Sequence, residues 1–322
     1  STPKPSSAAS DVYKRQLPYD ALIVGGSFAG LSAAMQLARA RRRICVVDAG
    51  QPRNRFAEAS HGFFGHDGAA PLALRDQARA QLLAYPSVDF VADAVETARV
   101  LPAEEGDTRF AVTLASGQTL VTRRLLLATG VHDLLPDDIE GLAPRWGSSV
   151  LHCPYCHGYE FIDRRLGVLG SGELSVHQAM LVADWGPLTL FTHGLPPLDA
   201  KTRAQLDARG ITLDPGRVVA LEGPASALEA VRFDDGRRLP IDALFVAPAQ
   251  RQGSTLAAQL GCAFDEGPLG LVVRTDPMMK TTSVPGVFAA GDAALAMQNA
   301  TLASADGVRA GASLHRSLIF VD

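Results

Sequence analysis

Apolar and polar positions along the chain form short apolar runs separated by amphipathic stretches. Near the start, Tyr19–Val24 predicts a strand, Leu31–Arg39 predicts a helix, and the apolar run Ile44–Val47 predicts a second strand. This order is that of a βαβ unit, in which the helix connects two parallel strands. A further helix is expected around Pro71–Ala84.

The same order returns in the second half of the chain. There Arg165–Leu169 predicts a strand, Val176–Asp184 a helix and Pro187–Phe191 the next strand. Both halves continue with further strand-like runs: Arg109–Leu114, Leu120–Thr122 and Arg124–Ala128 in the first, and Leu228–Phe233 and Ile241–Pro248 in the second. An internal duplication of a nucleotide-binding domain is the simplest account of this repeat.

The last part of the chain is expected to complete the first domain, with a turn and buried strand over 281–290 and a helix over Thr301–Leu314. We therefore predict an α/β fold of two Rossmann-like domains, each built of three layers (ββα). The second domain is inserted in the first. Residues 19–140 and 268–322 would form the first domain, and residues 141–267 the second. Residues 1–18 are expected to be a mobile or cloning-derived tail.

Composition and charge narrow the range of functions. The 322 residues are 47% hydrophobic and 20% charged, with a net charge of −4, which is ordinary for a globular protein long enough for two domains. No basic run with interleaved aromatics indicates nucleic acid, and no apolar stretch approaches the roughly 18 residues of a membrane span. We therefore expect neither nucleic acid nor a membrane as a partner, and we expect a cytoplasmic location.

The turn after the first strand carries a dinucleotide-binding fingerprint. Gly25 and Gly30 occupy the first and third glycine positions of G-x-G-x-x-G, while Ser27 replaces the middle glycine. Asp48 follows about twenty positions further on, where an acidic residue binds a free ribose hydroxyl. The N-terminus of the following helix would favour a pyrophosphate.

A second turn of this kind, Gly170–Ser175, follows the first strand of the second half. Between the two turns lie Cys153 and Cys156, three positions apart. Such a pair can form and break a disulfide within one loop, with one sulfur held as thiolate. Its position between two nucleotide-binding units favours electron exchange between a flavin and a disulfide.

The same segment, Cys-Pro-Tyr-Cys-His, allows three other interpretations. It is the attachment signature of c-type haem, but residues 1–15 lack the apolar core of a signal peptide. A zinc site with His152 and His157 is disfavoured because Cys45 and Cys262 are isolated and form no second ligand pair, so we expect no metal. A structural disulfide is disfavoured in a reducing cytoplasm.

Taken together, these motifs resemble the low-molecular-weight thioredoxin reductase branch of the flavin disulfide reductases, over residues 19–322. The resemblance implies FAD in the first domain, with Asp48 at the adenosine ribose and Gln298 beside the flavin ring. It implies that the Gly291-Asp292 pair contacts the pyrophosphate and ribityl region. It also implies that Cys156 faces the flavin and that Cys153 meets the substrate, with a homodimer as the assembly.

Other residues are expected near the cofactor. Arg53 and Asn54 follow the acidic strand end and predict a cofactor-side loop, although a solvated basic turn would have the same sequence. His61 lies in a glycine-rich loop that would wrap the flavin. Thr129 and Gly130 follow the return strand of the first domain.

Two departures from the resemblance matter for function. His157 stands directly after Cys156, where thioredoxin reductases carry an acid. Its imidazole could accept and return a thiol proton, or could merely cap the loop. Residues 192–197 lack the arginines that would grip the 2′-phosphate of NADPH, so use of NADPH is doubtful.

These departures are similar to those of FAD-dependent dithiol oxidases of the gliotoxin and holomycin type, which pass electrons from a substrate dithiol through FAD to oxygen. The resemblance implies a small-molecule dithiol or disulfide, or a small redox protein, as partner. Two alternatives stay open: a disulfide reductase driven by NADPH or ferredoxin, and a flavin redox sensor.

Overall fold

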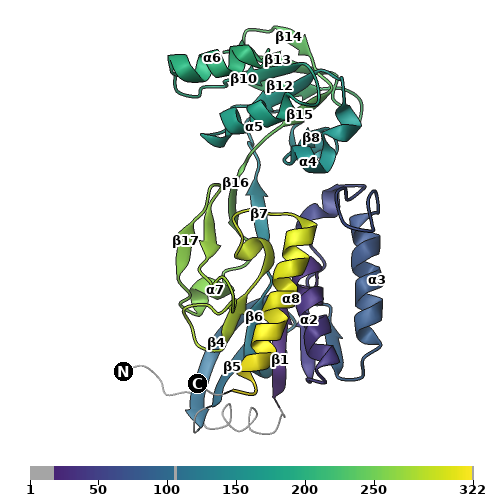
Figure 1. The fold of residues 1–322 in the computed structure, drawn as a ribbon, viewed down its shortest axis with the longest axis vertical. Helices are drawn as coiled ribbons and strands as arrows, with labels where there is room; N and C mark the ends of the chain where they lie inside the picture. Colours follow the sequence, from purple (N-terminus) through teal and green to yellow (C-terminus); the bar gives the residue numbers. More distant parts are fainter. Residues whose placement is uncertain (1–17, 105–106, 321–322) are drawn as a thin grey trace.

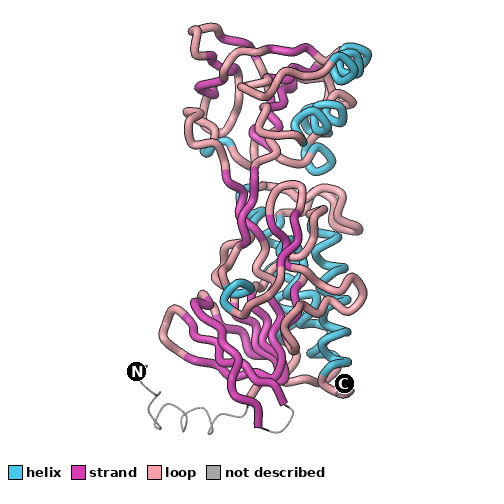
Figure 2. The backbone as a smooth tube through the Cα atoms, turned by 90° about the vertical axis from the view of Figure 1, so that its left-hand side faces the viewer, coloured by secondary structure: helices cyan, strands magenta, loops and turns pink. Residues whose placement is uncertain are grey.

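A computed structural model describes residues 18–104 and 107–320. Two α/β units follow one another along the long axis of the molecule, joined by a pair of adjacent strands (Figures 1 and 2). The predicted α/β fold of two Rossmann-like domains is confirmed. The expected tail at residues 1–18 lies, apart from residue 18, outside the described residues.

The first domain is built on a mixed sheet with strand order β3-β2-β1-β6-β5-β4, and β19 pairs with the end of β6. Strands β1, β2, β3, β6 and β19 are parallel, whereas β4 and β5 are antiparallel additions. The bounds are β1 Tyr19–Val24, α2 Phe28–Arg39, β2 Ile44–Val47, α3 Pro71–Leu83, β3 Val88–Val91, β4 Val95–Glu104, β5 Asp107–Leu114, β6 Thr119–Leu127, β19 Val287–Ala289 and α8 Ala300–Ser317.

Two apolar runs expected as separate strands, Leu120–Thr122 and Arg124–Ala128, form the single strand β6. Its first half pairs with β5 and its second half with β19, so different neighbours bury the two halves. Helix α2 begins at Phe28, three residues earlier than expected, because its first turn is part of the glycine turn itself.

Helices α2 and α8 lie side by side on one face of this sheet (Figure 1). Their close approach depends on small residues. A Cβ atom added at Gly307 would meet the backbone of Ala29, and one at Gly311 would meet the carbonyl oxygen of Ala33 at 2.6 Å. Both helices follow parallel strands, so their N-termini lie at the same edge of the sheet, where the cavity described below begins.

The second domain repeats the plan with a parallel sheet of order β11-β10-β9-β15-β8 and a separate antiparallel meander, β12-β13-β14. The repeat expected from the sequence is therefore present in space. The bounds are η2 Ala143–Arg145, β8 Val150–Leu151, β9 Leu166–Leu169, α5 Leu174–Val182, β10 Leu188–Phe191, α6 Ala200–Ala208, β11 Thr212–Asp214, β12 Val218–Glu222, β13 Ala230–Phe233, β14 Arg238–Pro240 and β15 Ala243–Phe245.

The domains are connected by β7 (Val131–Leu134) and β16 (Ala249–Gln252), which pair antiparallel. Both expected domain boundaries need correction. Ile139 already packs in the core of the second domain. After β16 the chain returns to the first domain, where α7 (Leu256–Gln259), β17 (Phe264–Glu266) and β18 (Leu271–Val273) follow.

The return occurs earlier than residue 268 because Leu256, Ala257 and Cys262 supply apolar side chains to the core beneath β1 and β6. Nothing in the composition of the crossing strands marks this point, since packing alone defines it. In the described part of the chain, no helix is both long and apolar enough to cross a bilayer.

Candidate active site

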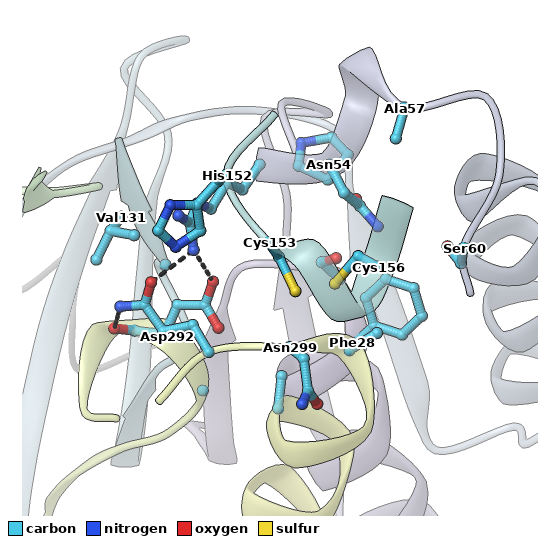
Figure 3. A pocket seen from close by; sticks show the side chains of 18 of the residues that line it. Phe28, Asn54, Ala57, Ser60, Val131, His152, Cys153, Cys156, Asp292 and Asn299 are labelled. Atoms are coloured by element: carbon cyan, nitrogen blue, oxygen red, sulfur yellow. Dashed lines mark hydrogen bonds and ion pairs between the residues drawn. The ribbon is translucent and has the colours of Figure 1, made fainter. Parts of the chain in front are cut away.

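A cavity of about 630 Å³ lies where the two domains face each other (Figure 3). The first domain contributes residues from four stretches, 25–29, 48–63, 128–133 and 290–303, and the second domain contributes residues from 146–157. With one exception, every expected site residue lines this cavity: Gly25, Ser27, Asp48, Arg53, Asn54, His61, Thr129, Gly130, Cys153, Cys156, His157, Gly291, Asp292 and Gln298.

The exception is Gly30, which lies outside the cavity wall. A Cβ atom at Gly30 would collide with the carbonyl oxygen of Gly25, so this glycine lets α2 pack directly against the turn. Gly25 itself has φ +105°, a conformation that favours glycine. Among the described residues, Ser27 caps α2 by position but makes no side-chain capping hydrogen bond.

Asp48 follows β2 and reaches back to the glycine turn. Its Oδ1 accepts a hydrogen bond from the Gly26 N–H at 3.0 Å. The first N–H groups of a helix have no acceptor within the helix, and Phe28 and Ala29, which carry two of them, line the cavity. The turn therefore combines a carboxylate with helix N–H groups, as a dinucleotide requires.

Arg53 lies in η1 (Arg53–Phe56). Its side chain is bonded within the structure, so the segment is not the solvated basic turn that the sequence also allowed. Its guanidinium donates to both carboxylate oxygens of Asp133, at 2.6 and 2.8 Å, to Asp292 Oδ2 at 3.1 Å and to Gln298. Asp133 lies on β7 and its carboxylate is nearly buried. Sequence reasoning missed Asp133, because no motif marks a lone acid on a connecting strand.

Asp292 lies in η4 (Gly291–Ala293), in the segment that leads from β19 to α8. Burial raises the pKa of Asp292, and the nearby Arg53 charge opposes that rise. The Gly291 N–H donates to Asp306 Oδ2 at 3.0 Å, and Asp306 pairs with buried Lys280 at 3.1 Å. This buried ion pair, also missed from the sequence, fixes the position of the Gly-Asp turn.

The N-terminus of α8 forms another part of the wall. Asn299 caps the helix, its side chain accepting a hydrogen bond from the Leu302 N–H at 2.7 Å. Ala300 and Thr301, in the first turn, line the cavity. Gln298, just before the helix, donates to Gln250 Oε1 at 3.0 Å and so contacts the connecting strand β16.

The cysteine pair lies in α4 (Pro154–His157), with Cys153 as its N-cap residue. Figure 3 shows both sulfur atoms facing the start of α8, and both cysteines are free thiols. The Cys156 thiol donates to the Cys153 sulfur, and with the N–H groups of Tyr155 and Cys156 it lowers the pKa of Cys153 to about 7 despite burial. The same bond raises the pKa of Cys156. Of the two sulfurs, Cys153 is therefore the one that ionises more readily to the thiolate.

Two residues hold the start of this loop. The Gln178 side chain donates to the His152 carbonyl oxygen at 2.7 Å, and His152 Nδ1 lies 3.2 Å from the Val246 carbonyl oxygen. Burial lowers the pKa of His152. Its hydrogen bond gives His152 a structural role, and the side chain also lines the cavity.

His157 follows Cys156 and faces His61 from the first domain, with ring centroids 6.4 Å apart. Burial lowers the pKa of His157, the charge of Glu160 opposes this, and His61 lowers the pKa further. The imidazole is thus neutral at neutral pH and can accept a proton. Glu160, in η3 (Tyr159–Phe161), lies 3.3 Å from His61 Nε2.

The second glycine turn differs from the first in its hydrogen bonds. The N–H groups of Ser171 and Gly172 both donate to Ser175 Oγ, at 2.9 and 3.3 Å. Leu195 packs over Gly170, where an added Cβ atom would come within 2.9 Å of its side chain. The donors that would meet a pyrophosphate are therefore bonded within the chain. Among residues 18–104 and 107–320, no three His, Cys, Asp or Glu side chains are grouped so as to hold a metal ion.

A pair of Rossmann-like domains with a dithiol facing a nucleotide-type cavity defines a flavin-dependent disulfide oxidoreductase. In agreement, residues 19–307 match the family described as pyridine nucleotide-disulphide oxidoreductase, so the chain belongs to this family. The resemblance drawn from the motifs is thereby confirmed, and the protein is an FAD-dependent oxidoreductase.

Similar proteins match over nearly the whole chain. The thioredoxin reductase tcpT of Claviceps purpurea is 34% identical over 307 residues, covering 91% of this chain and 92% of the relative. The crystal structure of an oxidoreductase from Agrobacterium tumefaciens is 43% identical, with a TM-score of 0.88, covering 95% of this chain and all of the other. The crystal structure of HlmI is 37% identical, with a TM-score of 0.87, covering 94% and 93%.

The cavity residues fit FAD. Two helix N-termini, those of α2 and α8, line one cavity and suit a pyrophosphate. Asp48 keeps one carboxylate oxygen beyond its bond to Gly26, which suits a ribose hydroxyl. Phe28 and Phe63 supply apolar walls, and the cysteine pair lies within the same cavity.

Proposed function

We propose that this protein is a dithiol oxidase, which oxidises a substrate dithiol to a disulfide through Cys153 and Cys156 and delivers the electrons, through FAD, to oxygen. The observation that carries this proposal is the second glycine turn. Its N–H donors are taken by Ser175, which occupies the position that Gly30 holds in the first turn. A pyridine nucleotide as electron donor would need those N–H groups.

The region beyond β10 supports the same conclusion. Thr192 stands where Asp48 stands in the first domain, and the stretch 192–197 contains neither an arginine nor an acid. The Nδ1 atom of His193 is also used within the domain, because it accepts a hydrogen bond from the Val218 N–H at 3.1 Å. The bidentate arginine contact that usually holds a 2′-phosphate has no counterpart in this stretch.

The cofactor would be held by the first domain. Asp48 would bind the adenosine ribose, and Gly25, Ser27 and the start of α2 the pyrophosphate. Asp292, Gln298 and the start of α8 would face the rest of the cofactor. The remaining residues of this site are Gly30, which lets α2 pack against the turn, and Arg53, Asn54, His61, Thr129, Gly130 and Gly291 in the surrounding wall.

The chemistry of the residues follows from their environments. A substrate thiolate attacks Cys153 in the oxidised pair, the Cys153–Cys156 bond breaks, and Cys156 leaves as a thiolate. The second substrate thiolate then attacks the sulfur of the first, which releases the substrate disulfide and leaves both cysteines reduced. His157, neutral because burial lowers its pKa, accepts the proton of the incoming thiol.

FAD, when bound, would supply the acceptor for the two electrons that the cysteines release as their disulfide re-forms, and would allow their transfer to oxygen, which with two protons would give hydrogen peroxide. The substrate would be a small dithiol, or a small redox protein carrying one. We further propose a homodimer and a cytoplasmic location, on the basis of the family resemblance and of the two isolated, buried cysteines, Cys45 and Cys262.

A second candidate is a thioredoxin-reductase-like disulfide reductase driven by NADPH or ferredoxin. The names of the similar proteins from Claviceps purpurea and Leptosphaeria maculans, both thioredoxin reductases, favour it. A flavin redox sensor is a third candidate, which steady turnover of a small dithiol would exclude.

Anaerobic mixing separates the candidates. The purified protein should be yellow with non-covalent FAD, and dithiothreitol should bleach the flavin absorption near about 450 nm rapidly, while NADPH and NADH do so slowly or not at all. Fast, saturable reduction by NADPH would establish the reductase instead. A colourless protein that cannot be reconstituted with FAD would rule out all three candidates.

A further inference from the structure

Beyond the paired connecting strands, the first domain approaches the second near α4 (Figure 1). His61, from the loop after η1 in the first domain, and Glu160, from η3 in the second, lie within ion-pairing distance across this gap, and the pair is charged when His61 is protonated. Their Nε2 and Oε1 atoms are 3.3 Å apart, with side chains 24% and 37% exposed. The half-buried pair therefore links the two domains directly.

The loop that carries His61 is held in shape by its own bonds. The Gly62 N–H donates to Asp67 Oδ1 at 2.8 Å, and Ser60 and Ala69 form a bridge at the base of the loop. The same Asp67 oxygen lies 3.5 Å from His61 Nδ1. His61 is thus oriented by one carboxylate on its own loop and meets a second one on the other domain.

Glu160 is coupled to the dithiol through the chain. Helix α4 runs into η3 without a break, because the Gly158 N–H bonds to the Pro154 carbonyl and the Phe161 N–H to the Gly158 carbonyl. Any force on Glu160 therefore acts on the short helix that carries Cys156.

We propose that His61 and Glu160 form an interdomain clasp that holds the dithiol helix against the first domain, so that His61 is a positioning residue for electron transfer between the cysteines and the cofactor. The clasp rests on the proposed function only in requiring the dithiol to meet FAD, and it holds for either direction of electron flow. Domains joined by short segments and a limited interface move relative to each other by default. Rates that need close alignment fall when this alignment is lost.

The expected size of the effect follows from the exposure of the pair. Partly exposed ion pairs change an equilibrium constant by about two- to fivefold, so removing the clasp should lower the ratio of the closed to the open arrangement by that factor. Overall unfolding should change little, since both domains keep their cores.

The first test is a double-mutant cycle on flavin reduction by dithiothreitol under anaerobic conditions. His61→Ala and Glu160→Ala should each slow reduction by up to about fivefold, and the double variant should be no slower than the slower single variant. His61→Gln, whose amide can donate a hydrogen bond to Glu160, should restore most of the rate. Additive losses in the double variant would overturn the clasp.

Matched controls come from the same two regions. His66→Ala changes a histidine on the same loop, and Glu140→Ala removes an exposed carboxylate of the second domain that pairs with Arg232. Neither should change the rate. Chemical reduction of the flavin by dithionite, which bypasses the cysteines, should be equal in all variants, and a slowed dithionite reaction would overturn the positioning role.

A second test avoids catalysis. In FAD-free protein, iodoacetamide should alkylate Cys153 faster, by up to about fivefold, in His61→Ala and Glu160→Ala than in the parent or the controls, because the dithiol is less covered. Unchanged alkylation would overturn the clasp and assign any slowed reduction to proton transfer by His61. If dithiothreitol fails to reduce the flavin even in the parent, the proposed function fails while alkylation still tests the clasp.

Discussion

The two glycine turns of this chain have the same place in the same fold but differ in their hydrogen bonds. At the first turn, Gly30 allows α2 to approach Gly25, and the helix N-terminus meets the cavity without a side-chain cap among the described residues. At the second, Ser175 replaces that glycine and its hydroxyl accepts from the turn's own N–H groups. The serine at this position thus gives the second turn an acceptor for its own amides that the first turn lacks.

The comparison extends to the strand that follows each turn. In the first domain Asp48 returns to the turn and bonds to Gly26, whereas in the second domain Thr192 and His193 make contacts within the domain. The second domain instead contributes the cysteine pair and His157 to the shared cavity. A duplicated domain can therefore keep its fold while the residues of its turn and its contribution to the cavity change.

The largest effect is expected for a substitution that disrupts the first glycine turn. Gly30→Ala places a Cβ atom against the Gly25 carbonyl oxygen, and overpacking of this kind costs about 1–3 kcal/mol. We expect the variant to lose FAD, seen as a loss of flavin absorption after purification. The matched change Gly172→Ala in the second turn meets open space and should leave FAD content and stability unchanged. Equal FAD content in both variants would contradict the assigned difference.

The next test removes the two cysteines that the second domain contributes to the cavity. Cys153→Ser and Cys156→Ser should each abolish dithiol turnover while FAD content stays the same. If Cys156 faces the flavin, a long-wavelength charge-transfer absorption should develop only in Cys153→Ser, where the Cys156 sulfur has lost its partner. Its appearance only in Cys156→Ser would show that the roles of the two sulfurs are reversed.

A smaller loss is expected for His157→Ala, about 100-fold at neutral pH, because general base catalysis contributes roughly that much or more. Burial lowers the pKa of His157, so the parent should keep its activity until the pH falls below that lowered pKa and the imidazole is protonated. The deficit of the variant should shrink toward pH values of about 8.5, where thiols ionise unaided. Identical pH–rate profiles for parent and variant would make His157 a structural residue.

The smallest effect is expected for a substitution of Ser175, the residue that distinguishes the second turn from the first. Ser175→Ala leaves the N–H groups of Ser171 and Gly172 without their acceptor and should lower the free energy of unfolding by about 0.5–1.5 kcal/mol. Urea denaturation measures this, with FAD content as the control that must not change. A variant as stable as the parent would mean that these donors are satisfied in another way.

Much of the fold could be predicted because it depends on short stretches of sequence. Apolar runs such as Ile44–Val47 form the buried strands, and the glycine turn with Asp48 defines one end of the cavity. The domain boundaries could not be predicted in this way. Whether Leu256 joins the first or the second core depends on which sheet lies beneath it, and the adjacent sequence does not contain that information.

The sequence by itself determined the dithiol, since Cys153 and Cys156 need only one helical turn to meet. It also determined the two glycine turns and fourteen of the residues that line the cavity. Only the tertiary structure decided how these groups are paired: Arg53 with Asp133, His61 with Glu160, and the turn amides with Ser175. The reason is physical, because hydrogen bonds and ion pairs act over about 3–4 Å and join positions that chain spacing alone cannot bring together.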